Sequence, residues 1–376
     1  MMFPKRLQQK LQKRVENNSL RKLSTSNDLI DFSSNDYLGF AKSVVIFKES
    51  HQYLIDNNFV QNGATGSRLL SGNHKLYTLV EQKLKETHLS EALLYNSGYD
   101  ANLGFFSAVP QRHDVILYDE FSHASIRDGI RLSSAKAYAF KHNDLSDLKE
   151  KLQKFSENTD VYVATEAVFS MDGDSPNLGE LCCLCKSYNA YRVVDEAHAL
   201  GVFKYGLVQQ LHLENEVFAR IVTFGKAMGC HGAAILGNQH LKNYLINFSR
   251  AFIYTTGGAP HSLATIHTAY LHLEREDNAV NNLYNNIQYF KKICIDLQLN
   301  SLFVNSESAI QCCVIPGNKN VKNCAELIQS NGFNVKPILS PTVPEGRERL
   351  RFCMHSYNTH GQIDEVLNLL STFVNK

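Results

Sequence analysis

Residues 191–198, YRVVDEAH, form a short apolar run that ends in charged and polar side chains, and such units recur between about residues 91 and 240. The predicted strands are Ala92–Tyr95, Val115–Tyr118, Ala135–Phe140, Val161–Thr165, Tyr191–Val194, Arg220–Phe224 and Ala233–Leu236. The helical stretches between them are Tyr99–Ala108, Ala124–Ser133, Leu145–Phe155 and Leu178–Tyr188. Strands that alternate with helices form βαβ units. The sequence therefore predicts an α/β fold with a mostly parallel central sheet and helices on both faces.

The pattern changes after about residue 258. It predicts a smaller α+β unit with helices Ser262–Glu276, Val321–Gln329 and Ile363–Val374 and strands Ala309–Ile315 and Leu350–Met354. We therefore expect an N-terminal arm (1–45), a large cofactor-binding domain (46–258) and a small C-terminal domain (259–376). In the arm, Leu7, Leu11 and Val15 recur at helical spacing, which predicts an amphipathic helix at the surface or at an interface.

Composition excludes several classes of function. Lys plus Arg number 38 and Asp plus Glu number 37, so no global field attracts nucleic acid or an anionic membrane. No apolar run reaches the roughly 18 residues that a membrane span needs. The basic first 22 residues lack a continuous apolar segment, which argues against a secretory signal and leaves a transit peptide as the weaker alternative. We expect a cytoplasmic protein.

The nine cysteines show no spacing typical of a disulfide framework. Cys182 and Cys185 form a C-x-x-C pair inside a predicted helix, without a second pair at zinc-like spacing. We interpret them as buried thiols and expect no metal site.

Lys226 lies in IVTFGKAMG (221–229), where a β-branched strand runs into a Thr/Gly-rich turn. The flanking residues Gly225 and Gly229 have no side chain, so a bulky group is able to approach the backbone closely. On its own this pattern is weak, because a lysine in a loop is usually just solvated.

Asp195 ends a buried strand about 30 residues before the lysine. A carboxylate at such a place is costly to desolvate without a cationic partner. A protonated pyridinium nitrogen would be such a partner, and it makes pyridoxal 5′-phosphate (PLP) an electron sink. The ordinary alternative is an aspartate that caps the next turn.

Two further motifs follow strands of the same sheet. Ser97, Gly98 and Tyr99 begin a helix, where free N–H groups and the helix dipole suit a phosphate, although an ordinary N-cap serine fits equally. His123 begins the next helix and is placed either to stack on an aromatic cofactor or to lie at the surface. Fold-type I PLP enzymes typically carry a phosphate-binding helix start, a histidine, an aspartate and a lysine, in this order along one sheet.

The amino-acid sequences of these motifs resemble those of the α-oxoamine synthase family over roughly residues 30 to 370. The matching stretches are DFSSNDYLG (31–39), GSRLLSG (66–72), SHAS (122–125), FSMDGD (169–174), DEAH (195–198), TFGK (223–226), PTVPEG (341–346) and RLR (349–351). Two departures are the Gly257-Gly258 pair and residues 202–207, which lack the usual glycine-rich run. Neither touches Lys226 or Asp195.

The resemblance implies a role for each matched position around the cofactor ring. Lys226 would hold PLP as a Schiff base and later move the substrate proton, with its pKa lowered by the positive charge of the cofactor. Asp195 would pair with the pyridine nitrogen. His198 would bond the phenolic oxygen, and His123 would stack on the ring.

The remaining implied roles concern the phosphate, the substrate and the second subunit. The backbone of Ser97, Gly98 and Tyr99 and the side chain of Thr223 would hold the phosphate, and Ser170 would lie near the cofactor. Asn35 and Arg351 would bind the carboxylate of the amino acid. Thr255 and Thr256 would reach the phosphate of a partner subunit, which implies a homodimer with shared active sites.

Members of this family condense an amino acid with an acyl thioester and release carbon dioxide. The compact length and short arm look closest to members that join L-alanine to pimeloyl-CoA in biotin synthesis. Members that use glycine and acetyl-CoA are the nearest alternative, and the carrier is either coenzyme A or an acyl carrier protein. A non-catalytic partner subunit of the same fold is less favoured, because Lys226, Asp195 and both histidines are retained.

Overall fold

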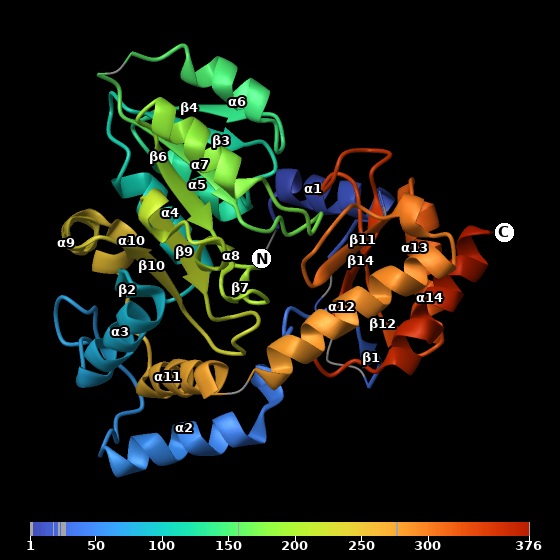
Figure 1. Ribbon diagram of the computed structural model, residues 1–376, viewed down its shortest axis with the longest axis horizontal. Helices are drawn as coiled ribbons and strands as arrows, with labels where there is room; N and C mark the ends of the chain where they lie inside the picture. Colours follow the sequence, from blue (N-terminus) through green and yellow to red (C-terminus); the bar gives the residue numbers. More distant parts are fainter. Residues whose placement is uncertain are drawn as a thin grey trace.

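The computed structural model describes residues 3–17, 19–21, 23, 28–156, 158–275 and 277–375 (Figure 1). Within these ranges, the larger lobe is built on a seven-stranded sheet in the order β2-β10-β9-β6-β5-β3-β4. The strands are β2 (Glu91–Tyr95), β3 (Val115–Asp119), β4 (Lys136–Phe140), β5 (Val161–Glu166), β6 (Tyr191–Asp195), β9 (Ala219–Thr223) and β10 (Ala233–Gly237). Only β10 runs antiparallel to its neighbours in this sheet. The predicted α/β fold is confirmed.

Helices cover both faces of this sheet, as the alternation of its side chains requires. In β2, Leu93 and Tyr95 pack in one apolar cluster with helices α4, α9 and α10, whereas Ala92 and Leu94 pack in another with α3 and α11. The helices of this lobe are α2 (Val44–Asp56), α3 (Lys75–His88), α4 (Gly98–Ala108), α5 (Ala124–Leu132), α6 (Leu145–Leu152), α7 (Leu178–Ser187), α8 (Leu207–Gln210), α9 (Gln239–Phe248), α10 (Arg250–Ile253) and α11 (Pro260–Arg275). Cys182 and Cys185 are buried free thiols on α7.

The smaller lobe contains an antiparallel sheet in the order β11-β14-β13 and three helices. Its elements are α12 (Asn278–Asp296), β11 (Ile310–Val314), α13 (Asn318–Ser330), β12 (Phe333–Asn334), β13 (Lys336–Ile338), β14 (Arg349–Cys353) and α14 (His360–Val374). Helix α12 was not predicted, because its many asparagines favour helices poorly. It nevertheless buries an apolar stripe, Leu283, Ile287 and Phe290, at helical spacing.

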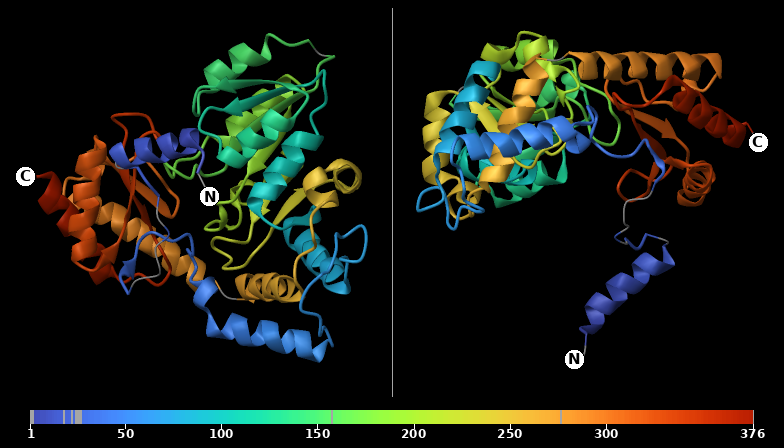
Figure 2. Two further views of the ribbon diagram at one scale, coloured as in Figure 1. Left: turned by 180° about the vertical axis from the view of Figure 1, so that it is seen from behind. Right: turned by 90° about the horizontal axis from the view of Figure 1, so that it is seen from below.

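The N-terminal arm divides between two environments. Strand β1 (Ile30–Asp31) pairs in parallel with β12, so the end of the arm joins the small lobe. Helix α1 (Lys5–Glu16) is helical as predicted, has no buried residue and stands apart from both lobes (Figure 2). Its role at an interface stays a prediction. Throughout the ranges described above, every helix is too short or too polar to cross a membrane.

The predicted start of the small domain falls at the beginning of α11. This helix packs against α2 and α3 of the large lobe, whereas α12 packs against α14 of the small lobe. We therefore propose that the small lobe starts after Arg275 rather than at residue 259. Glu276, the last residue of the predicted helix, lies outside the described residues.

Candidate active site

The carboxyl ends of β6 and β9 bring the central residues of the predicted site together. The two strands are parallel neighbours, with Asp195 aligned to Ile221, so the turns that follow them meet at one edge of the sheet. His198 lies in the turn after β6, and Lys226 lies in the turn after β9. The Lys226 Nζ atom is 2.6 Å from the His198 Nε2 atom.

Lys226 lies in surroundings that favour its neutral amine. Burial lowers the pKa of Lys226 to about 8, although Asp195 and Glu166 oppose this effect by attraction. The low pKa therefore arises from the protein itself, before any charge on the cofactor is considered. His198 is also held neutral, because burial and the neighbouring Lys226 keep its pKa well below the ordinary value.

Asp195 is buried at the end of β6 and is held by two donors. Its Oδ1 atom accepts a hydrogen bond from the Ala197 N–H at 2.8 Å, and its Oδ2 atom accepts one from the Asn102 amide at 2.6 Å. Asn102 lies on α4, one turn after Gly98. Helix α4 thus spans the site from the predicted phosphate end to the carboxylate.

His123 caps the N-terminus of α5 and connects to Asp195 through side chains. Its Nδ1 atom is 2.8 Å from the Ser125 hydroxyl, which accepts a bond from Asn102 at 3.0 Å. The His123 backbone N–H donates to the Glu166 carboxyl at 2.6 Å. Asn102 and Glu166 were not predicted, since only the fold shows that they reach the site.

The predicted phosphate residues Ser97, Gly98 and Thr223 lie together. A Cβ atom on Gly98 would come within 3.3 Å of the Thr223 Cβ atom, so only glycine leaves the space beside this hydroxyl open. The first turn of α4 leaves backbone N–H groups free by its geometry, while Ser97 caps it at Asp100. The exposed phenol of Tyr99 donates to Asp128, so Tyr99 is placed to serve through its backbone.

Thr255 and Thr256 lie beside this end of the site. The Asn96 amide, next to Ser97, donates to the Thr255 hydroxyl at 3.0 Å and to the Thr256 carbonyl at 2.8 Å. Crowding explains the first glycine of the unexpected Gly257-Gly258 pair, because a Cβ on Gly257 would meet the Gly72 carbonyl oxygen at 3.0 Å. Whether the two threonines serve the site of a partner subunit stays a prediction.

Asn35 and Arg351 form the opposite wall, contributed by the arm and the small lobe. The Arg351 guanidinium donates to the Asn35 side-chain oxygen at 3.0 Å and to the Ser170 carbonyl at 2.8 Å. The buried Tyr37 hydroxyl donates to Asn35 at 3.1 Å and lies 2.8 Å from the His198 Nδ1 atom. Tyr37, whose role was not predicted, therefore joins the Arg351 side to the Lys226 side.

A cavity of about 430 Å³ opens between His123 and Ser170. Its apolar lining comes from Phe121, Phe169, Met171, Val343 and Pro344. Two of its arginines are engaged within the protein: Arg127 binds the Ser122 carbonyl, and Arg349 pairs with Asp172. The exposed Arg21 also lines this space.

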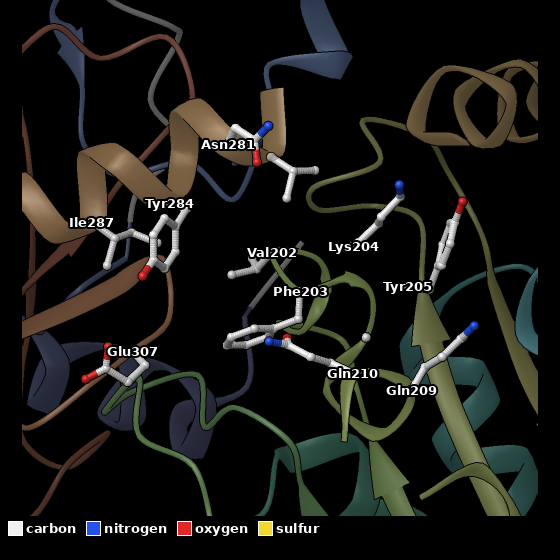
Figure 3. A pocket seen from close by; sticks show the side chains of 12 residues that line it. Val202, Phe203, Lys204, Tyr205, Gln209, Gln210, Asn281, Tyr284, Ile287 and Glu307 are labelled. Carbon is white, nitrogen blue, oxygen red and sulfur yellow. The ribbon is translucent and has the colours of Figure 1, made fainter. Parts of the chain in front are cut away.

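A second cavity, of about 600 Å³, has a lining that does not include Lys226 (Figure 3). It separates α12 from residues 202–207, the segment without the usual glycine run. This segment follows β7 (Leu200–Gly201) and contains β8 (Lys204–Tyr205) and the first residue of α8. Phe203 and Tyr284 face each other across it. None of its lining residues belongs to the predicted site.

The residues around Lys226 fit PLP. Lys226 offers a neutral amine for the aldehyde, and Asp195 offers a buried carboxylate for a protonated ring nitrogen. The open space at Gly98 leaves room for a phosphate, and the backbone N–H groups in the first turn of α4 offer donors for it. The Thr223 hydroxyl lies beside this space and donates to the Gly232 carbonyl at 3.1 Å in this structure.

Comparison with known proteins agrees with this chemistry. The model of the family "Aminotransferase class I and II" matches residues 27–370. The 8-amino-7-oxononanoate synthase of Emericella nidulans is 35% identical over 98% of this chain and 95% of its own. The solved 8-amino-7-oxononanoate synthase of Francisella tularensis is 27% identical, covers 93% of this chain and 99% of its own, and superposes with a TM-score of 0.79.

A serine palmitoyltransferase from S. paucimobilis, solved with a bound PLP–myriocin aldimine, shares the fold. Its TM-score is 0.89 at 23% identity, with 99% of this chain and 97% of the other covered. The chain belongs to the aminotransferase class I and II family. Within it, the chain belongs to the PLP-dependent α-oxoamine synthases, a family whose substrates are amino acids and acyl thioesters of coenzyme A.

Proposed function

We propose that this enzyme condenses L-alanine with a pimeloyl thioester, releasing carbon dioxide and the free thiol and forming 8-amino-7-oxononanoate for biotin synthesis. The observation that carries this proposal is the site itself: Lys226, His198 and Asp195 meet at the strand ends, opposite Arg351 and Asn35. The 35% identity to the Emericella nidulans synthase supports the choice of substrates.

Each residue around the cofactor has a separate role that depends on its position. PLP, when bound, supplies an electron sink for the negative charge that develops at the substrate Cα atom. Asp195 keeps the ring nitrogen protonated, and Asn102 holds the Asp195 carboxylate in place. Lys226, with a pKa of about 8, is able to take the Cα proton near neutral pH and return it later. His123, at the N-terminus of α5, would stack on the ring.

Arg351 and Asn35 bind the carboxylate of the amino acid in this proposal. The guanidinium is already oriented by the Ser170 carbonyl and by Asn35, so little side-chain entropy remains to be lost on binding. Tyr37 connects this wall to His198, because its hydroxyl forms a hydrogen bond with the His198 Nδ1 atom. The amino group would then face Lys226.

The cavity between His123 and Ser170 supports a medium-length acyl chain with a distal carboxylate. Its lining is largely apolar, which suits methylene groups. Among the arginines that line it in the described part of the chain, Arg21 is the one offered to such a carboxylate, since Arg127 and Arg349 are bound within the protein. A dicarboxylic chain such as pimeloyl fits this arrangement better than an acetyl group.

A thiol-release assay tests the substrate proposal. Alanine, glycine and serine would be crossed with pimeloyl, acetyl, succinyl and palmitoyl thioesters, on both coenzyme A and an acyl carrier protein. We expect alanine with a pimeloyl thioester to give the highest kcat/KM. Preference for glycine and acetyl-CoA would overturn this substrate pair and leave the family assignment intact.

A variant sharpens the same test. Arg21→Gln should raise the KM for a pimeloyl thioester by roughly 10-fold and leave the KM for an octanoyl thioester unchanged, because only the first carries a distal carboxylate. Arg6→Gln, on the exposed helix α1, is the matched control. Equal effects on both thioesters would remove Arg21 from the acyl site.

The assembly that we propose is a homodimer with shared active sites, located in the cytoplasm. The support is the family membership and the position of Thr255 and Thr256 beside Asn96, at the edge of the site. Sedimentation should give the mass of two 42.4 kDa chains. A monomer with full activity would contradict shared sites.

A further inference from the structure

His142, two residues after β4, is held between two carboxylates. Its Nδ1 atom is 2.9 Å from the Asp119 Oδ1 atom, and its Nε2 atom is 2.8 Å from the Asp174 Oδ2 atom. Its ring stacks on Phe121 with centroids 4.3 Å apart and meets the edge of Phe169 at 4.5 Å. The imidazole is therefore fixed on both edges and in contact with two aromatic rings.

The histidine in this place is a cation at neutral pH. Each ring nitrogen faces a carboxylate oxygen, so both must carry hydrogen to donate. The carboxylates of Asp119 and Asp174 outweigh burial and raise the pKa of His142 to about 10, and Glu120 accepts from its backbone N–H at 3.0 Å. A group that keeps its proton through the neutral range is poorly suited to acid–base catalysis.

The segments that His142 joins carry residues of the active site. Asp119 and Phe121 lie just before His123. Asp174 and Phe169 bound the segment 169–174, in which Ser170 offers its carbonyl to Arg351. The clamp, defined here as His142 with Asp119 and Asp174, thus ties the ends of β3, β4 and β5 together beside the substrate wall.

The small lobe binds segment 169–174 from the other side. Arg349 binds the Met171 carbonyl at 3.1 Å and pairs with Asp172, while the hydroxyls of Ser306 and Ser308 donate to the Gly173 carbonyl at 2.7 and 2.9 Å. Segment 169–174 is therefore the place where the large lobe and the small lobe hold one piece of chain. In the described structure, the one ion pair that holds the Asp174 end of this segment on the large lobe is that of the clamp.

We propose that His142 is a positioning residue that sets segment 169–174 and, through the Ser170 carbonyl, aims the Arg351 guanidinium at the carboxylate of the amino acid. The proposal rests on the role of Arg351 given above. It assigns His142 an effect on amino-acid binding without contact to substrate or cofactor.

Hydrogen exchange on the cofactor-free protein tests the first half of the proposal. Asn in place of His142 reaches only one carboxylate and lacks the charge. In His142→Asn, we expect at least ~10-fold faster exchange at the Phe169 and Gly173 amides, which bond to Asp174 and Phe169 at 2.9 and 2.8 Å. The control is His267→Asn, which removes a stack on Tyr53 between α11 and α2, far from this segment. Unchanged exchange at both amides would overturn the proposal.

Steady-state kinetics test the second half. We expect the KM for the amino acid to rise roughly 5- to 20-fold in His142→Asn, and the KM for the acyl thioester, whose proposed cavity Phe169 and Met171 also line, to rise by a smaller factor. Asp174→Asn, which keeps His142 paired with Asp119, should give the same split and serves if the histidine variant fails to fold. Lower thermal stability with both KM values unchanged would make the clamp purely structural.

The two proposals fail in different ways. The exchange experiment needs neither cofactor nor substrate, and the kinetic one uses whichever amino acid and thioester the wild type prefers. A wild type that rejects alanine therefore refutes the substrate assignment alone. Equal amino-acid binding by wild type and both clamp variants refutes the clamp alone.

Discussion

The two walls of the active site are built in different ways. The cofactor wall comes from one sheet and the helices that follow its strands. Asp195 ends β6, and His198 and Lys226 lie in the turns after the neighbouring strands β6 and β9. On the substrate wall, Asn35 and Arg351 meet although they lie 316 residues apart in the chain. The residues of the cofactor wall come from the large lobe, whereas those of the substrate wall come from the arm and the small lobe. Changes on the first should abolish chemistry, and changes on the second should weaken binding.

The largest expected effect falls on the cofactor wall. Asp195→Asn removes the charge that we propose keeps the ring nitrogen protonated, and we expect kcat to fall by several orders of magnitude while the protein still binds PLP. The comparison is Asp147→Asn, at the start of α6, which should leave kcat unchanged. Near-normal turnover in Asp195→Asn would refute the role of this carboxylate.

On the substrate wall, Arg351→Lys should act through binding. Lysine loses the planar arrangement that contacts Ser170 and Asn35 together, and a hydrogen bond to a charged group contributes about 1.5–3 kcal/mol. The KM for the amino acid should therefore rise roughly 10- to 150-fold, with a smaller change in kcat. Arg192→Lys, whose side chain pairs with Glu216, is the control. A loss confined to kcat would place Arg351 with the cofactor instead.

The pH dependence of cofactor uptake reports the burial of Lys226. The aldehyde reacts with the neutral amine, whose folded-state pKa of about 8 is depressed from the ordinary value of 10.5. The rate of PLP binding by the cofactor-free protein should rise as pH increases towards 8 and change by only about 2-fold between pH 8 and 10. An ordinary lysine would gain roughly 80-fold over that interval. Stopped-flow absorbance distinguishes the two.

The smallest effect is expected at Glu166. Burial, with Asp195 nearby, raises the pKa of this carboxyl well above the ordinary range, which favours its protonated form. Glu166→Gln keeps an oxygen for the His123 N–H and should retain activity within about 3-fold, while Glu166→Ala should lose roughly 10-fold. A loss in Glu166→Gln as large as in Glu166→Ala would show that the ionised carboxylate is required.

The same contrast explains what the sequence could predict. All strands predicted between residues 91 and 240 are found in the large lobe, because apolar runs and turns there follow the βαβ pattern, and strand order then brings Asp195 and Lys226 together. Asn102 and Glu166 were missed because a helix interior and a strand end give no signal of what they face. Asn35 and Arg351 came from family resemblance alone, since no local pattern joins positions so far apart. Tyr37 lay inside a matched motif, but only the structure shows its contact with His198.

One measurement tests the central claim most directly. The protein purified with PLP would be reduced with borohydride, digested and mapped by mass spectrometry, with Lys226→Ala and Lys204→Ala as paired variants. We predict that the visible absorbance band bleaches and that the pyridoxyl mass is found on Lys226 in the wild type and in Lys204→Ala, and on no lysine in Lys226→Ala. Modification of another lysine, or none in the wild type, would contradict the account.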